Sequence, residues 1–162
     1  MVFGGTAHIS CYDILQGIGR VKKQANRPSL IVEEDYRTLA AFRHILRQFM
    51  AFSETAAREK GLRPQQHQAI LTIKAGGGEG VSVGELAEQL LIRHHSAVEL
   101  VDRLVAADLV VRTEAPDDRR RVRLTLTRKS EEALAALSAT HLSELRRTKP
   151  MLEQLLRRLD AG

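Results

Sequence analysis

Residues 81–127 decide the fold of this chain, and they read VSVGELAEQLLIRHHSAVELVDRLVAADLVVRTEAPDDRRRVRLTLT. Ser82 followed by Glu85 is a capping-box pattern, in which the serine caps a helix start and the glutamate three residues later bonds back to the cap. The pattern predicts a short helix that ends near Leu90, then a tight turn and a second helix over about residues 94–107. This order is typical of a helix-turn-helix.

The second of these helices has an apolar side and a polar side. Five apolar residues at helical spacing predict its buried face: Ala97, Leu100, Val101, Leu104 and Val105. Polar residues occupy the opposite side: His94, His95, Ser96, Glu99, Asp102 and Arg103. Polar groups at the N-terminal end of such a helix are the ones that contact base edges in the major groove of DNA.

Two β-like runs follow, at residues 109–113 and 121–127. In the second run Val122, Leu124 and Leu126 alternate with polar residues, which predicts one buried and one solvated face. The segment between the runs is rich in turn formers, so we expect a hairpin with an arginine-rich tip. Three arginines are placed there to contact the DNA backbone or the minor groove: Arg119, Arg120 and Arg121.

Amphipathic segments flank this region on both sides. Acidic residues 33–35 favour the start of a long helix, which Gly61 is placed to end, and Pro64 suits the first turn of the next. Another long helix is predicted over about residues 128–147, and Pro150 ends or kinks it before a last short helix. The broad apolar stripe of the first helix predicts two buried faces, one within its own domain and one against a partner subunit.

Three motifs in this order resemble those of a MarR-type transcriptional regulator: residues 81–90, 101–104 and 117–127. The Asp-Arg-Arg sequence followed by Leu-Thr is the most specific of them. The resemblance implies a mainly α fold with a small β-hairpin wing, a winged helix-turn-helix joined to a long-helix dimerisation region. The implied organisation is a loosely structured extension at 1–32 and a MarR-like domain at 33–162, with dimerisation helices at about 33–60 and 128–160 and a winged lobe at about 63–127.

The resemblance also implies a function. Family members are homodimers that bind pseudo-palindromic double-stranded DNA, and they are usually repressors. Many of them are released by a small aromatic or anionic effector. Carried onto this sequence, the DNA-binding residues are His94, His95, Ser96, Glu99, Arg103, Arg119, Arg120 and Arg121. Asp118 matches the acid that helps to fix the wing arginine. Glu99 departs from the family, because many members have arginine there, and an acid accepts from cytosine N4 but repels phosphate.

Composition narrows the function further. The 162 residues carry a net charge of +5 and a pI of about 9.8, which favours a polyanionic partner. No apolar run approaches the length of a membrane span, so we expect a cytoplasmic protein without a membrane partner. The glycines at 76–80 lack the Lys-Ser/Thr of a phosphate-binding loop, and no nucleophile or metal-ligand motif is evident. The sequence therefore predicts neither an enzyme nor a cofactor.

Several residues admit two interpretations. Phe49 and Phe52 are either dimer core or, together with His67, part of an effector pocket. His44, His67 and His141 could approach one another as metal ligands, although no spacing matches a firm motif. The only cysteine, Cys11, is either a redox switch or a bystander. The alternative to a DNA-binding regulator is a winged-helix module that binds proteins or effectors without reading DNA sequence.

Overall fold

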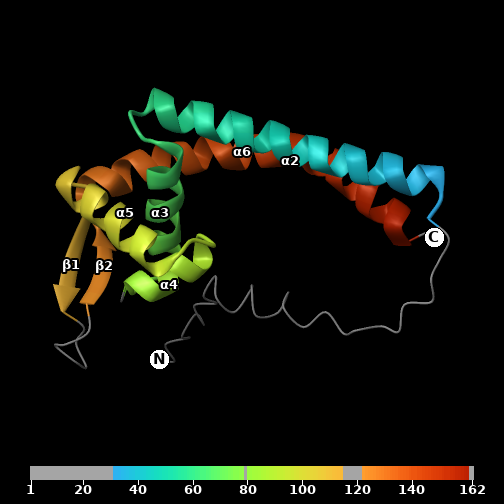
Figure 1. Ribbon diagram of the computed structural model, residues 1–162. Coiled ribbons are helices and arrows are strands. Elements are labelled where there is room, and N and C mark those ends of the chain that lie inside the picture. The colour runs from blue at the N-terminus through green and yellow to red at the C-terminus, as the bar shows by residue number, and fades with distance from the viewer. Residues whose placement is uncertain (1–30, 79, 115–121, 161–162) are drawn as a thin grey trace, which may run out of the picture. The chain divides into compact units, whose positions relative to one another are not determined.

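The computed structural model describes residues 31–78, 80–114 and 122–160 (Figure 1). Along the chain, the elements are α2 (Glu33–Glu59), α3 (Pro64–Ala75), α4 (Val83–Gln89), α5 (His94–Ala106), β1 (Val110–Glu114), β2 (Val122–Leu126) and α6 (Arg128–Asp160). The strands form one two-stranded antiparallel sheet. The prediction of a mainly helical fold with a small β-hairpin wing is therefore confirmed. No helix in the described part of the chain is long and apolar enough to span a membrane.

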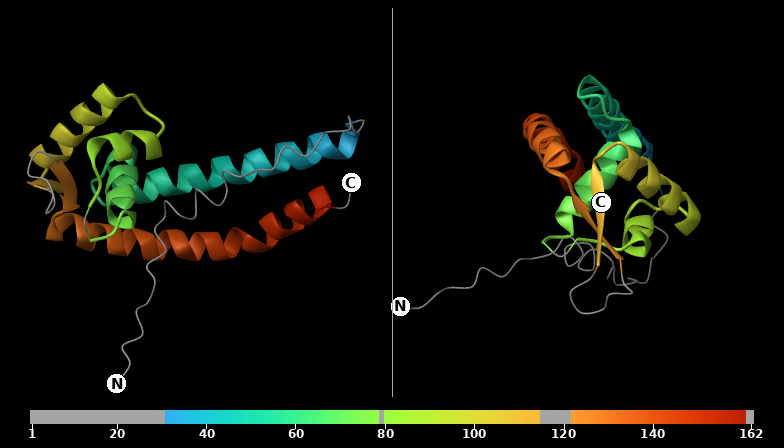
Figure 2. Two further views of the ribbon diagram at one scale, coloured as in Figure 1. Left: turned by 90° about the horizontal axis from the view of Figure 1, so that it is seen from below. Right: turned by 90° about the vertical axis from the view of Figure 1, so that its left-hand side faces the viewer.

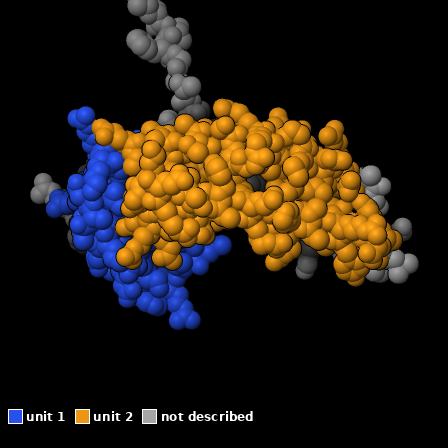
Figure 3. Space-filling view, turned by 90° about the horizontal axis from the view of Figure 1, so that it is seen from above, with its two compact units in different colours: residues 1–24, 68–130 blue, residues 25–67, 131–162 orange. Residues whose placement is uncertain are grey.

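The described residues fall into two compact units (Figure 3). Residues 68–130, blue in the figure, form the winged-helix unit. Residues 31–67 and 131–160, orange in the figure, form the helical unit. The predicted N-terminal extension with Cys11 lies almost wholly outside the described residues, which begin at residue 31.

The winged-helix unit is built around apolar side chains of α4 and α5. Leu86, Val101 and Leu104 are completely buried, and the capping box that begins α4 is present as predicted. The Glu85 N–H donates to Ser82 Oγ at 3.2 Å, and the Ser82 N–H donates to Glu85 Oε2 at 2.6 Å. Because both bonds satisfy amides that a helix start leaves open, they fix where α4 begins.

The hairpin pairs Val110 with Leu126 at one end and Glu114 with Val122 at the other. Val81 adds an isolated bridge to Leu124, which is completely buried. The predicted alternation in β2 is wrong at Val122, whose side chain is 43% exposed. Val122 lies at the end of the hairpin far from the Val81 bridge, where the described residues offer it little cover.

The helical unit contains α2 and most of α6, which run alongside each other in opposite chain directions (Figure 2). Ile45, Leu134, Leu137 and Leu155 are buried between or near them. The Arg158 Nη1 atom lies 2.9 Å from Glu34 Oε1, so an ion pair joins the C-terminal end of α6 to the N-terminal end of α2. The two long helices predicted at the ends of the domain are thus members of one unit.

The prediction that a separate short helix follows Pro150 is wrong, because α6 continues through this proline. Proline lacks an amide hydrogen, so the helix loses one backbone bond at that point. Intact turns on both sides, ending at Asp160, keep the helix continuous despite the loss.

Many apolar side chains of the helical unit remain uncovered, with exposed fractions between 37% and 58%. On α2 they are Tyr36, Leu39, Phe42, Leu46 and Met50, and on α6 they are Leu142, Leu145, Met151, Leu156 and Leu159. On α2 these positions recur every three or four residues, which places them on one helix face. The described residues of one copy of the chain give this face no apolar cover.

Candidate nucleic-acid interface

Helix α5 presents its polar side to solvent at the N-terminal end. His94, His95 and Glu99 are exposed, and Ser96 is half-buried. The opposite side is anchored in the unit, because Ala97 and Val101 are completely buried and Leu100 is 3% exposed. Burial of one face fixes the rotation of the helix about its own axis, so the polar side is held outward.

Two valines of α5 depart from the predicted pattern. Val105, predicted as part of the buried stripe, is 38% exposed in the last turn of α5, at the edge of that stripe. Val98 is 36% exposed on the same side as His94 and His95. The sequence prediction missed Val98 as a residue of this exposed side, and its only available signal was its spacing of four residues from His94.

The turn before α5 sets the direction of that helix. The Leu91 N–H donates to the Glu88 carbonyl at 3.1 Å, and the Ile92 N–H donates to the Ala87 carbonyl at 3.0 Å. This is the Schellman pattern, which requires a left-handed backbone at Leu91, whose φ is 54°. Helix α5 has no side-chain cap, since Arg93 makes no such bond.

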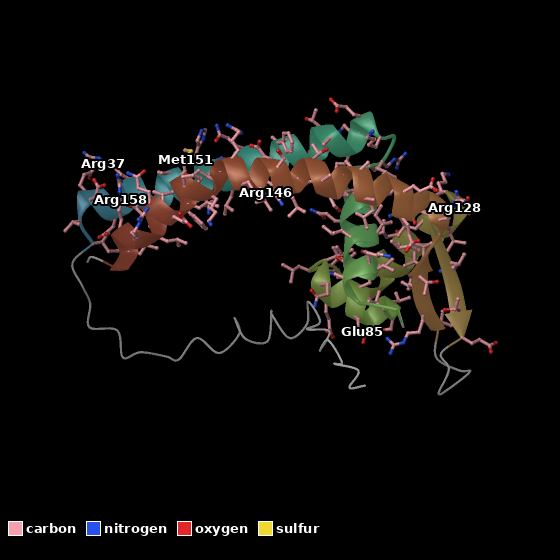
Figure 4. The ribbon with its side chains drawn as sticks, turned by 180° about the vertical axis from the view of Figure 1, so that it is seen from behind. Arg37, Glu85, Arg128, Arg146, Met151 and Arg158 are labelled. Atoms are coloured by element: carbon pink, nitrogen blue, oxygen red, sulfur yellow. The ribbon has the colours of Figure 1, made fainter. Side chains whose placement is uncertain are left out.

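Two ion pairs connect the hairpin to the helices of the same unit. The Arg112 Nη2 atom of β1 lies 2.6 Å from Asp102 Oδ1 of α5. The Arg123 Nη1 atom of β2 lies 2.8 Å from Glu85 Oε2 of α4, which Figure 4 labels. Each strand of the hairpin is therefore linked to a different helix, and the position of the wing is coupled to both.

The acids of α5 are partnered by bases. Asp102 pairs with Arg112, and Glu99 Oε2 lies 3.9 Å from Arg103 Nη1, one helical turn away. Opposite charges at these distances offset each other, so neither acid confronts DNA as an isolated negative charge. The spacing of four residues between Glu99 and Arg103 already places these two side chains on the same side of the helix.

The predicted wing residues Asp118, Arg119, Arg120 and Arg121 lie outside the described residues. The strands that lead to them are described up to Glu114 and from Val122. Because these two residues pair across the hairpin, the intervening segment begins and ends at one edge of the sheet. The structure therefore gives the position from which the tip extends.

The residues predicted to bind an effector gather in the helical unit. His67 and His141 stack with ring centroids 4.9 Å apart and planes 15° apart. Phe49 and Phe52 meet His141 edge-on, at centroid distances of 6.0 and 5.9 Å. Ser53 joins them, with Oγ 2.8 Å from His141 Nε2. Three helices contribute to this cluster.

The protonation of this histidine pair follows from its contacts. His141 Nδ1 lies 2.6 Å from the Leu137 carbonyl, which only accepts, so Nδ1 carries the hydrogen and donates. In the neutral ring Nε2 then accepts from the Ser53 hydroxyl. Burial, and secondly the proximity of His141, lower the pKa of His67, whose side chain is 5% exposed. His67 is therefore held neutral near pH 7.

The cluster does not extend to a metal site. His44 is exposed on α2, whereas His67 and His141 are buried. Among the described residues, no group of three or more His, Cys, Asp or Glu side chains is arranged to hold a metal ion. The two imidazoles instead stack on each other, and the His141 ring also contacts the rings of Phe49 and Phe52.

Comparisons with known proteins agree with this architecture. A model of the MarR family matches residues 60–121, and no curated protein matches the chain. The chain is similar to the multiple antibiotic-resistance repressor (MarR) from Listeria monocytogenes, at 26% identity and a TM-score of 0.59, covering 77% of this chain and 97% of that one. The expected resemblance to MarR-type winged-helix proteins is confirmed.

Two further solved structures share the fold at lower identity. CouR from Rhodococcus jostii, bound to p-coumaroyl-CoA, is 22% identical with a TM-score of 0.62, over 82% of this chain and 94% of that one. A mutant of Staphylococcus aureus MepR, bound to an oligodeoxyribonucleotide, is 18% identical with a TM-score of 0.59, over 78% and 96%. At these identities the likeness concerns the fold.

Proposed function

We propose that this chain, which resembles MarR-type winged-helix proteins, is a homodimeric, sequence-specific DNA-binding regulator that represses transcription until a small molecule releases it. The exposed polar row at the start of α5 carries the proposal. His94, His95, Ser96 and Glu99 lie where a recognition helix contacts base edges, on a helix whose other face is locked into the unit.

DNA affinity in this proposal comes mainly from phosphate neutralisation, and selectivity comes from base contacts. Arg103 and the wing residues Arg119, Arg120 and Arg121 supply the cations, with Asp118 fixing the wing. Imidazoles and a serine hydroxyl on α5 supply hydrogen-bond donors and acceptors for base edges. The MepR relative solved with an oligodeoxyribonucleotide supports this use of the fold.

The test is selection of binding sites from random duplex DNA, followed by titration of the selected site at several salt concentrations. We expect an inverted-repeat site and an affinity that falls steeply with salt. His95→Ala should shift the base preference, whereas Arg120→Ala should weaken binding to every sequence. Gln68→Ala, which changes an exposed neutral residue of α3 in the same unit, is the control. Binding that is indifferent to both salt and sequence would contradict the proposal and favour the protein- or effector-binding module.

Homodimerisation is proposed from the uncovered apolar face of α2 and α6. Ten large apolar side chains there are between 37% and 58% exposed, which is more than scattered surface residues explain. A second copy of the chain would bury them. Sedimentation should give a dimer for the wild type and a monomer for Leu46→Glu. Gln48→Glu makes the same change of one negative charge at a nearby exposed position of α2 and should leave the dimer intact.

Release by an effector is proposed from the cluster formed by Phe49, Phe52 and His67. Aromatic rings beside imidazoles suit a small aromatic or anionic molecule, and the CouR relative was solved with an aromatic acyl-CoA. A ligand shifts DNA affinity only through unequal affinity for two states of the protein. Thermal-shift screening of aromatic acids, followed by DNA titration with each binder, tests this. Binders that leave DNA affinity unchanged would contradict the repressor-release model.

A further inference from the structure

Leu91 combines two features that are unusual in one residue. Its side chain is 93% exposed, although it is large and apolar. Its backbone is left-handed, with φ at 54°, at the C′ position that ends α4. Glycine is the residue that favours this position, and the same pattern at the end of α2 uses Gly61, whose φ is 73°.

The backbone of Leu91 costs the free protein stability, and its exposed side chain contributes none in return. A left-handed backbone brings Cβ close to the following carbonyl oxygen in every residue except glycine. An exposed leucine gains nothing from burial, because its apolar surface stays in water. Strained residues that the folded state alone does not explain gather at functional sites. The large apolar side chain of Leu91 is therefore presented to solvent from a fixed turn, where a partner can contact it.

We propose that Leu91 is a DNA-contact residue whose side chain packs against the C–H surface of the duplex when α5 enters the major groove. The apolar surfaces available there are the thymine methyl group and the deoxyribose carbons beside the phosphates. The proposal rests on the DNA-binding function proposed above. It adds an apolar contact to a recognition surface that the sequence presents as entirely polar.

The surroundings of Leu91 favour DNA as the occupant. Leu91 lies three residues before His94, in the turn that leads into the end of α5 that faces the groove. Arg93, His94 and His95 follow it, all exposed, and no acid lies between Glu88 and Glu99. A lone apolar group beside an arginine and two imidazoles complements a polyanion that carries methyl groups and sugars.

The decisive variant is Leu91→Gly, because the proposal gives it two effects of opposite sign. Removing the left-handed strain should raise the melting temperature by about 3 °C. Removing the apolar contact should weaken binding to the selected DNA site roughly fivefold. A residue with only a structural role would not combine higher stability with weaker DNA binding. Circular dichroism checks that the variant keeps the wild-type fold.

Asp108→Gly is the matched control, since Asp108 occupies the same position at the other end of α5 with φ at 56°. It should raise stability in the same direction but by less, because aspartate tolerates the left-handed region better than leucine does. Loss of its negative charge cannot weaken attraction to DNA. Leu91→Gly also makes the turn more flexible, and Leu91→Asn separates this effect from loss of the apolar side chain. Asparagine tolerates the left-handed region without the full freedom of glycine and supplies no apolar side chain. Leu91→Asn should bind DNA as weakly as Leu91→Gly, whereas Leu91→Met should bind about as tightly as the wild type.

Replacing each thymine of the selected site by deoxyuridine distinguishes the two apolar sources. If a thymine methyl is the partner, one replacement weakens the wild type and leaves Leu91→Gly unaffected. If deoxyribose is the partner, no replacement distinguishes the two proteins, although Leu91→Gly still binds more weakly. Leu91→Gly binding as tightly as the wild type overturns the inference and leaves the proposed function standing. A wild-type protein that binds no DNA removes both.

Discussion

The ion pair between Glu85 and Arg123 gives the sharpest quantitative prediction about the winged-helix unit. It joins α4 to β2 across 38 residues of sequence, with 2.8 Å between Nη1 and Oε2. The Arg123 side chain is only 15% exposed, and that of Glu85 is 47% exposed. Exposed pairs contribute about 0.2–1 kcal/mol, whereas hydrogen bonds to charged groups contribute about 1.5–3 kcal/mol. This half-buried pair should fall between these ranges, at about 1.5 kcal/mol.

A double-mutant cycle measures this coupling in the free energy of unfolding. Glu85→Gln removes the charge but keeps the acceptor that the Ser82 N–H needs, since glutamine also completes a capping box. Arg123→Met keeps the apolar stem and removes the guanidinium. Urea unfolding of the wild type, both single variants and the double variant yields the coupling energy, provided that the slope with urea is constant.

The pair between Asp102 and Arg112 serves as an internal comparison. Its side chains are 60% and 39% exposed, so its coupling should lie below about 1 kcal/mol and should fall further at 1 M salt. The coupling of Glu85 to Arg123 should resist salt better because Arg123 is largely shielded. A coupling below about 0.3 kcal/mol for Glu85 and Arg123 would refute the argument that burial strengthens this link.

Three further predictions concern the effect of single substitutions on the free energy of unfolding. The lowered pKa of His67 means that the unfolded chain binds more protons than the folded chain below about pH 6.5. The free energy of unfolding should therefore decrease as the pH is lowered below this value. His67→Leu should flatten this dependence in urea titrations. Gly80→Ala should lower the free energy of unfolding by about 2–4 kcal/mol, because φ is +71° and a Cβ would collide with a backbone carbonyl of β2. In Gly77→Ala the new Cβ meets no neighbour. This variant should show only the cost of the left-handed backbone, about 1–2 kcal/mol, in the same assay. Ser130→Ala should lower the free energy of unfolding by about 0.5–1.5 kcal/mol, because it removes the Ser130 hydroxyl at 2.6 Å from the buried Leu109 carbonyl, which keeps the Thr127 N–H at 3.2 Å. An unchanged free energy of unfolding would contradict this assignment.

Local sequence patterns predicted the elements because each pattern acts within a few residues. The capping box at Ser82 begins α4, and Gly61 ends α2 as its C′ residue. Asp108 also occupies a left-handed cap, as its tolerance of that conformation allows. Pro150 misled the prediction, because the proline rule concerns one missing bond and does not weigh the turns on either side.

Features that depend on distant partners were outside the reach of such patterns. Nothing near Arg123 in the sequence indicates that its partner is Glu85, and the stacking of His67 on His141 joins segments 74 residues apart. Apolar spacing also could not tell that Val105 is exposed, because a helical stripe does not show where its edge lies. These features arise from tertiary packing, which overrides local preference.

The charge pattern of α5 shows why this distinction matters for function. In sequence, Glu99 and Asp102 place two acids on the surface that should meet a polyanion, which argues against DNA binding. In the structure, Asp102 contacts Arg112 from the hairpin, and Glu99 lies one turn from Arg103. An acid paired in this way orients a cation that phosphate can still contact, because a guanidinium has five N–H donors. The acids of α5 are therefore compatible with DNA docking, and Asp102 additionally couples the recognition helix to the wing.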